Sequence, residues 1–218
     1  MMNMCAEIDK LRREIDTSLR VFYTLKKFVL MRSDPSAVSK LNSNPDFWLM
    51  YQYSLTMNLF IYLRRLYEGS GGAFNFQNFI KNCIDNIDEF SAQALRQRRI
   101  SEGQSVSDVD EFVKSAYHPT EADFRKLSKN VSLAKMSKMK KIATQLASKA
   151  FAHAVYDDKV IANLTNQLSY DDIEEALLSI WSCHRQVRQM YDNGRKPDFR
   201  ADEYPYKKEI YDSVSKQV

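Results

Sequence analysis

Three side chains near residue 150 have the types and the spacing that can act on a phosphodiester. Lys149, His153 and Asp157 follow one another at intervals of four residues, so a continuous helix would stack them on one face. An imidazole transfers protons near neutral pH, a carboxylate can orient it, and an ammonium group stabilises charge on a phosphate. We therefore take these three as candidate catalytic residues. For a lone helical histidine, however, a structural role is the commoner alternative.

The sequence that leads to His153 is strongly basic. From Glu121 to Lys149 it contains eight basic and two acidic residues, a local charge of +6, whereas the whole chain has a net charge of +4. Such a strip can neutralise several phosphates of RNA or DNA, with an affinity that falls as salt rises. A solvated lysine face is the simpler alternative. The candidate RNA-binding residues are Lys135, Lys138, Lys140 and Lys141.

Helices are the elements that must position these residues, because the apolar side chains recur at steps of three and four. The clearest stripe predicts a helix over about residues 5–31. Two pairs of residues have the spacing of helix N-caps, namely Thr120 with Asp123 and Ser169 with Asp172. Further helices are expected over about residues 46–68, 76–86, 88–100, 120–156 (which Asn130 to Ser132 can divide in two) and 169–193, with an exposed loop at 101–108.

The composition predicts an all-α fold in a single domain. The 218 residues are 44% hydrophobic and include just five glycines and five prolines, which is typical of a chain with few turns. We expect a bundle of about five to seven helices over residues 1–193. Residues 194–218, which mix prolines, tyrosines and charges, are expected to form a tail that packs loosely or binds a partner.

Several classes of protein are disfavoured by the sequence. The three cysteines are odd in number and far apart, which favours reduced thiols, and the adjacent Cys183 and His184 cannot face one metal from a helix. Charges from Glu7 onward argue against a signal peptide. The uncharged stretch from Phe47 to Leu63 is short for a membrane span and contains polar residues, so we expect a fully buried bundle helix. We therefore expect a cytoplasmic protein with no membrane partner, metal or cofactor.

The stretch Leu146-Ala-Ser-Lys-Ala-Phe-Ala-His153 resembles the final core motif of HEPN domains, which are all-helical proteins that act with RNA and nucleotides. Their signature is an arginine, four to six residues, and then a histidine. In many members the stretch reads Leu-Arg-Asn-Lys, an apolar residue and then Phe-Ala-His, and this chain matches that form at Lys149, Phe151, Ala152 and His153. Upstream, Leu63-Arg-Arg-Leu-Tyr-Glu68 and the Gly-Ser loop after it are similar to the abortive-infection (AbiU2-like) branch. Elsewhere, from roughly Ile8 to Tyr191, the resemblance rests on helix order and hydrophobic pattern.

This resemblance implies an RNA-directed protein of phage-defence or toxin type. In active relatives an Arg-His pair, usually doubled across a homodimer, cleaves RNA without metal. Some members act with a nucleotidyltransferase or an antitoxin as protein partner. This chain departs from the pattern, because Ala147 or Ser148 stands where the arginine belongs and Lys149 lacks a bidentate guanidinium.

Three hypotheses follow from the resemblance to HEPN domains and from the missing arginine. The first is a ribonuclease with a degenerate Arg/His site, in which His153 transfers protons and Lys149 contacts the phosphate. The second is a non-catalytic helical dimer that binds RNA, nucleotide or a partner protein. The third is a helical interaction protein of unrelated ancestry, whose lysine strip is a solvated surface.

Overall fold

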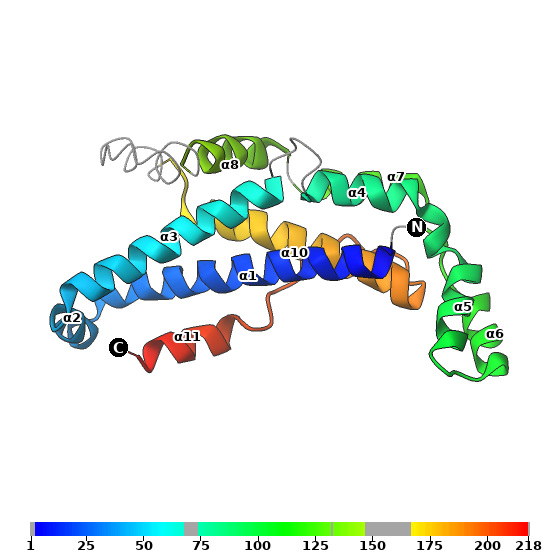
Figure 1. Ribbon diagram of the computed structural model, residues 1–218, viewed down its shortest axis with the longest axis horizontal. Helices are drawn as coiled ribbons and strands as arrows, with labels where there is room; N and C mark the ends of the chain where they lie inside the picture. The colour runs from blue at the N-terminus through cyan, green and yellow to red at the C-terminus, as the bar shows by residue number, and fades with distance from the viewer. Residues whose placement is uncertain (1–2, 68–73, 132, 147–166, 218) are drawn as a thin grey trace.

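The computed structural model describes residues 3–67, 74–131, 133–146 and 167–217, although not the side chains of residues 133–138 (Figure 1). Within these ranges the chain is all-α and has no strand, as predicted. It has ten α-helices there, so the prediction of five to seven is wrong. They are α1 (Met4–Leu30), α2 (Pro35–Asn42), α3 (Pro45–Tyr67), α4 (Phe76–Asp85), α5 (Ala92–Ser101), α6 (Val106–Lys114), α7 (Glu121–Asn130), α8 (Leu133–Gln145), α10 (Tyr170–Asn193) and α11 (Lys207–Ser215).

The additional helices α2, α6 and α11 form in segments where no helix was expected. Pro35 begins α2, because a proline fits the first turn of a helix, where its missing donor costs nothing. The Asp34 carboxylate caps this helix by accepting a hydrogen bond from the Ser36 amide at 2.9 Å. The expected loop at residues 101–108 is a short turn, because α6 begins at Val106.

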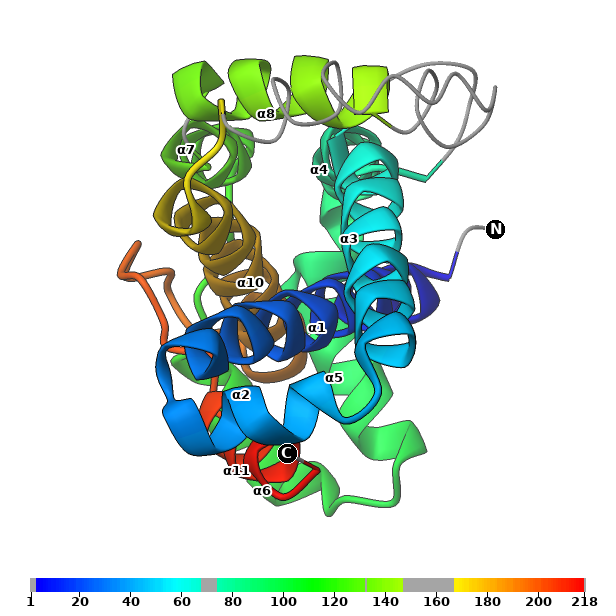
Figure 2. The same cartoon turned by 90° about the vertical axis from the view of Figure 1, so that its left-hand side faces the viewer.

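α1 runs along the length of the bundle and supplies the centre of its core (Figures 1 and 2). It packs against α3, α10, α11 and α4. The predicted apolar stripe is confirmed over most of its length, where its residues are buried at helical spacing, although Val29 at its end is half-buried. The buried residues of the stripe are Ile8, Leu11, Ile15, Leu19, Phe22 and Leu25. Burying such a stripe against several neighbours is the main source of stability for a helix of this kind.

α10 is the second long core helix and begins and ends as predicted. The Ser169 hydroxyl accepts from the Asp172 amide at 3.0 Å, and the Asp172 carboxylate accepts in return from the Ser169 amide. Gly194 ends the helix with a left-handed φ of 55°. A β-carbon there would lie 2.7 Å from Ala116 Cβ, so the close approach of the segment before α7 also requires glycine.

α3 differs from the prediction of a fully buried helix. Its second half buries Leu59, Phe60 and Leu63, whereas in its first half Leu49 is 60% and Met50 is 71% exposed. α3 lies at the edge of the bundle, so that among the described elements only one side of it has neighbours (Figure 2). No helix in the described ranges has the length and the apolar character needed to cross a membrane.

The segment after Gly194 returns along α1 and ends in α11 (Figure 1). Tyr204 and Ile210 are buried in the common core, and the Tyr204 hydroxyl donates to Asp16 at 2.6 Å. This segment, which we expected as a tail, therefore packs closely at these two positions. Its binding of a partner stays a prediction.

Candidate functional site

α8 carries the described part of the candidate RNA-binding strip. Met139, Ile142 and Leu146 are buried and recur at steps of three and four, so one side of α8 is fixed against α3 and α10. Lys140 and Lys141 fall on the opposite side and are exposed. In the described part of the chain no carboxylate forms an ion pair with either lysine. Both ammonium groups are therefore available to a phosphate.

The other predicted site residues cannot be compared with the structure. Lys135 and Lys138 lie on α8, but their side chains are outside the described part. Lys149, His153 and Asp157 lie outside the described residues altogether. Their alignment on one helix face stays a prediction. What the structure does establish is that Leu146, the residue after α8, is buried in the core next to the start of that segment.

On α7 the basic residues are partly engaged by the protein itself. Arg125 pairs with Glu121 one turn earlier, which neutralises that end of the strip. The Lys126 ammonium lies 3.8 Å from the centre of the Phe199 ring, a cation–π contact. Lys129 is exposed. The net charge of +6 already counts Glu121 and is unchanged, but two of the cations on α7 have partners within the chain, and Lys140 and Lys141 are the clearest phosphate contacts.

Phe199 is held in place by a buried glutamine. Its φ of 59° is unusual for a residue other than glycine, and such strain persists when neighbouring contacts fix it. The side-chain oxygen of Gln186 accepts a hydrogen bond from the backbone amide of Phe199 at 2.8 Å. The side-chain nitrogen of Gln186 donates to the backbone carbonyl of Arg200 at 3.2 Å. Beside them lies a pocket of about 360 Å³ between α7 and α10. These contacts fix the ring under Lys126.

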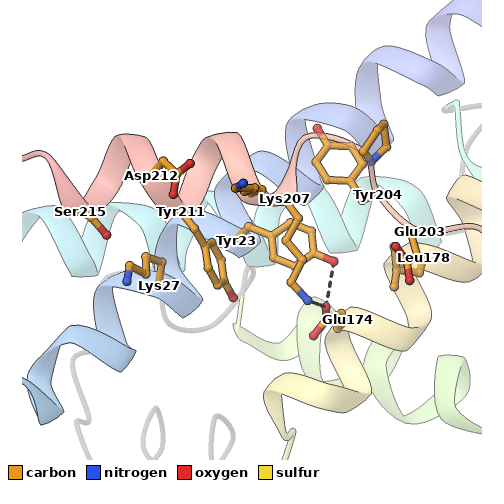
Figure 3. A pocket seen from close by; sticks show the side chains of 12 residues that line it. Tyr23, Lys27, Glu174, Leu178, Glu203, Tyr204, Lys207, Tyr211, Asp212 and Ser215 are labelled. Carbon is orange, nitrogen blue, oxygen red and sulfur yellow. Dashed lines mark hydrogen bonds and ion pairs between the residues drawn. The ribbon is translucent and has the colours of Figure 1, made fainter.

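A larger pocket, of about 740 Å³, lies where α1, α10 and the C-terminal segment meet (Figure 3). Its central group is the Glu174 carboxylate, which accepts from the Tyr23 hydroxyl at 2.9 Å and from the Lys207 ammonium at 2.8 Å. Lys26 donates to the same carboxylate. Burial alone would raise the pKa of Glu174, but the hydrogen bonds from Lys207, Lys26 and Tyr23 outweigh it and lower the pKa to about 2.

The chemistry of this pocket is therefore limited. A carboxylate with a pKa of about 2 is a weak base at neutral pH, and burial together with Glu174 raises the pKa of Tyr23 well above its usual range. Among the described residues that line the pocket there is no histidine or cysteine. We interpret the cluster around Glu174 as a structural contact that holds α1, α10 and α11 together. The sequence contained no signal for it, because Tyr23 and Glu174 are 151 residues apart.

His184 on α10, which we considered together with Cys183 as a metal ligand, is buried in the core. It is 3% exposed, and its pKa is lowered to about 4 by burial and then by the nearby charges of Arg12 and Arg188. Across the described ranges, no three His, Cys, Asp or Glu side chains gather in a way that could hold a metal ion. His184 is thus a neutral core residue at pH 7, in accord with its structural interpretation.

Comparison with protein families gives a match that spans nearly the whole chain. The profile of the HEPN family AbiU2 matches residues 1–209, which include the described helices from α1 to α10, the first residues of α11 and the motif that ends at His153. This match confirms the resemblance inferred from the sequence. Comparisons with curated proteins and with solved structures return no match.

Proposed function

Because the chain belongs to the AbiU2 family of HEPN domains, we propose that it is a phage-defence protein of the abortive-infection type and that RNA is its target. The observation that carries the RNA target is the exposed, unpaired pair Lys140 and Lys141 on α8. These two cations immediately precede the motif that ends at His153. An RNA strand bound along α8 would thus be led toward the candidate catalytic residues.

In the catalytic form of this proposal, the chain is a metal-independent endoribonuclease. His153 accepts a proton from a ribose 2′-hydroxyl, whose oxygen attacks the adjacent phosphorus while the bond to the 5′-oxygen breaks. The proton is then returned to the departing 5′-oxygen. Lys149 stabilises the charge on the phosphate, and Asp157 orients the imidazole. The products are a 2′,3′-cyclic phosphate and a 5′-hydroxyl.

Cleavage is tested by incubating the purified chain with total RNA in the presence of EDTA. We expect cleavage that is lost in His153→Ala and is blocked by a 2′-deoxyribose at the cleaved position. Circular dichroism of His153→Ala is the control for folding. Equal cleavage by both proteins, or cleavage that requires a divalent metal, would contradict the catalytic form.

A second candidate function is a non-catalytic module that binds RNA, and the missing arginine favours it. Ala147 and Ser148 cannot hold a scissile phosphate through a guanidinium fork. Ala147→Arg distinguishes the two forms. A site that merely lacks its arginine should gain cleavage in this variant, whereas a chain whose site has become a binding surface should bind RNA and still not cleave it.

RNA binding itself is tested with the double variant Lys140→Ser, Lys141→Ser. The matched control is Lys40→Ser, Lys216→Ser, which removes two exposed lysines from α2 and from the C-terminal end. Each phosphate contact on single-stranded RNA contributes about 0.7 to the slope of log affinity against log salt. We expect the α8 variant to reduce that slope by about 1.4 and the control to leave it unchanged. Equal effects of the two variants would exclude α8 as the contact surface.

A further inference from the structure

The pocket of about 360 Å³ between α7 and α10 lies where the chain passes from α7 toward α8. Its buried part is formed by four residues, which are Leu127, Ser182, Cys183 and Gln186. The residues around its opening are half-buried or exposed, and they are Asn130, Ser179, Phe199, Arg200 and Ala201. A cavity of this size, with apolar and aromatic walls and a few polar groups, is typical of a site for a small planar ligand. We call it the Phe199 pocket.

Phe199 gives this pocket an aromatic wall that is fixed in advance. Its left-handed φ of 59° costs free energy for a residue with a side chain, and such strain is found most often where a protein binds a ligand. The two hydrogen bonds from the buried Gln186 side chain to the backbone of Phe199 and Arg200 hold this conformation. A ring that is already held loses little conformational entropy when a planar ligand stacks on it.

Two polar side chains at the opening are available to a ligand. Within the described ranges, the Asn130 amide forms no hydrogen bond, and the Arg200 guanidinium forms neither a hydrogen bond nor an ion pair. An amide offers a donor and an acceptor side by side, which matches the N6 and N7 edge of adenine. A guanidinium binds a phosphate. None of the described lining residues is acidic, so a cationic ligand would find no counter-charge.

The position of the pocket connects it with the candidate RNA-binding strip. Asn130 is the last residue of α7, and α8, which carries Lys140 and Lys141, begins three residues later. Next to Asn130, the Lys129 side chain is exposed. Lys126 lies over the Phe199 ring but does not line the pocket. An RNA strand held by the cations of α8 would thus have its neighbouring nucleotides beside the Phe199 pocket.

We propose that the Phe199 pocket binds one unpaired purine base, with a preference for adenine, from the RNA on α8. The base stacks on the face of the Phe199 ring that Lys126 leaves free, Asn130 bonds to its N6 and N7 atoms, and Arg200 contacts the adjacent phosphate. Uracil stacks less strongly, because its ring is smaller. This site rests on the proposed RNA target, but it acts through stacking and hydrogen bonds, whereas Lys140 and Lys141 act through charge.

Fluorescence anisotropy with a labelled oligoadenylate of about ten nucleotides tests the stacking. Phe199→Gly removes the ring, and glycine adopts the left-handed φ without strain, so the segment should keep its conformation. We expect the affinity to fall about tenfold with an unchanged salt slope, because stacking releases no counterions. The matched control is Phe74→Gly, whose ring is also half-buried and lies 4.4 Å from a lysine ammonium, that of Lys10. It should bind like the wild type.

The same variant separates stacking from charge. Loss of the ring also frees Lys126, so a contact made by charge alone predicts a higher affinity in Phe199→Gly than in the wild type. An affinity for oligoadenylate that is equal or higher in Phe199→Gly would therefore overturn the proposal. Circular dichroism of each variant is the control for folding.

Replacement of adenine by 7-deazaadenine tests the hydrogen bonds of Asn130. This base stacks like adenine but lacks the N7 acceptor. We expect the wild type to bind the deaza oligonucleotide about tenfold more weakly than oligoadenylate, and Asn130→Ala to bind both equally. Alanine continues the helix at the end of α7, so the variant should fold. The same discrimination by Asn130→Ala and the wild type would contradict the role of Asn130.

The Phe199 pocket and the RNA target can fail separately. Binding that depends on Lys140 and Lys141 but neither prefers adenine to uracil nor responds to Phe199→Gly would overturn the pocket and leave the RNA target intact. If the wild type binds no oligonucleotide, the RNA target fails, and calorimetric titration with adenosine monophosphate decides the pocket. Binding that is lost in Phe199→Gly would then assign the pocket to a free nucleotide, whereas no binding would overturn it.

Discussion

α1 and α3 pack against each other, yet the apolar side chains of α1 are mostly buried, whereas several large apolar side chains of α3 are exposed. α1 is amphipathic and buries ten of its described residues, while α3 is more apolar in composition and buries five. The difference follows from their neighbours, because α1 is covered by α3, α4, α10 and α11, whereas α3 lies at the edge of the bundle. Polar side chains of α1 also form contacts with other helices. For example, the Arg188 guanidinium donates a hydrogen bond to the Asp9 carboxylate at 2.7 Å. The apolar composition of a helix thus predicts that its side chains favour burial. Whether other elements of the same chain bury them depends on where the helix lies in the bundle.

The strongest test of this contrast truncates one leucine on each helix. Leu11 on α1 is fully buried, so Leu11→Ala should lower the free energy of unfolding by about 2–5 kcal/mol through lost burial and a residual cavity. Leu49 on α3 is 60% exposed, and Leu49→Ala should change that free energy by less than about 0.5 kcal/mol. Urea denaturation at a concentration where the chain is monomeric measures both. Similar losses would mean that Leu49 is covered by other parts of the folded chain.

Acidification should weaken the contact between α1 and α10 through His184. Its pKa is about 4 in the folded chain against an ordinary value of 6.5, so the unfolded chain binds more protons between these values. Stability that is present above pH 6.5 is therefore lost as the pH falls toward 4, by about 3 kcal/mol in total. Urea denaturation at pH 7 and pH 4.5 should show a larger loss for the wild type than for His184→Leu. Parallel losses would contradict this role for His184.

Glu174 provides a third test, since it joins α1 to α10 and α11. Glu174→Gln leaves Lys207 without its counter-charge and removes one of the two carboxylates that pair with Lys26, the other being Asp171. We expect it to lower the free energy of unfolding by about 1–3 kcal/mol at pH 7. Because the folded pKa of Glu174 is depressed to about 2, its contribution is present above its ordinary value near 4.5 and is lost as the pH falls through 2. The matched control is Glu111→Gln, whose carboxylate pairs with Lys114 on the exposed side of α6. It should have little effect.

The smallest change in stability is expected on α3. Met50→Glu adds a charge where the side chain is 71% exposed, so the thermal midpoint of the monomer should hardly move, corresponding to less than about 0.5 kcal/mol. The same substitution on α1, Ile15→Glu, should prevent folding, because the carboxylate would be buried without a partner. Differential scanning calorimetry of dilute protein compares the two. A clear loss of stability in Met50→Glu would show that α3 does more for the monomer than its exposure indicates.

Much of the fold could be predicted from local signals. The bounds of α1, α3, α4 and α10 lie close to those expected, because periodic apolar residues and N-caps act within a few residues of one another. The helix count was underestimated where short helices carry weak periodicity. α6 lies in a polar stretch of which Val109 is buried, and α2 begins at a proline that equally well interrupts a helix.

The candidate site was predictable in a different way. The basic strip and the His153 motif are contiguous in sequence, so they could be found there, and Lys140 and Lys141 are exposed as expected. The engagement of Arg125 and Lys126 could not be foreseen in full. Phe199 approaches Lys126 because α10 turns the chain back at Gly194, and nothing near Lys126 in the sequence indicates it.

The sequence by itself determined the all-α class, the long amphipathic helices and the family, since each of these depends on residue types at fixed local spacings. The tertiary structure decided which apolar faces are covered and which charges are neutralised. Tyr23, Glu174 and Lys207 meet through the packing of α1, α10 and α11, and the outer side of α3 is open because no described helix packs there. Burial and pairing depend on contacts between distant segments, and local spacing carries no information about those.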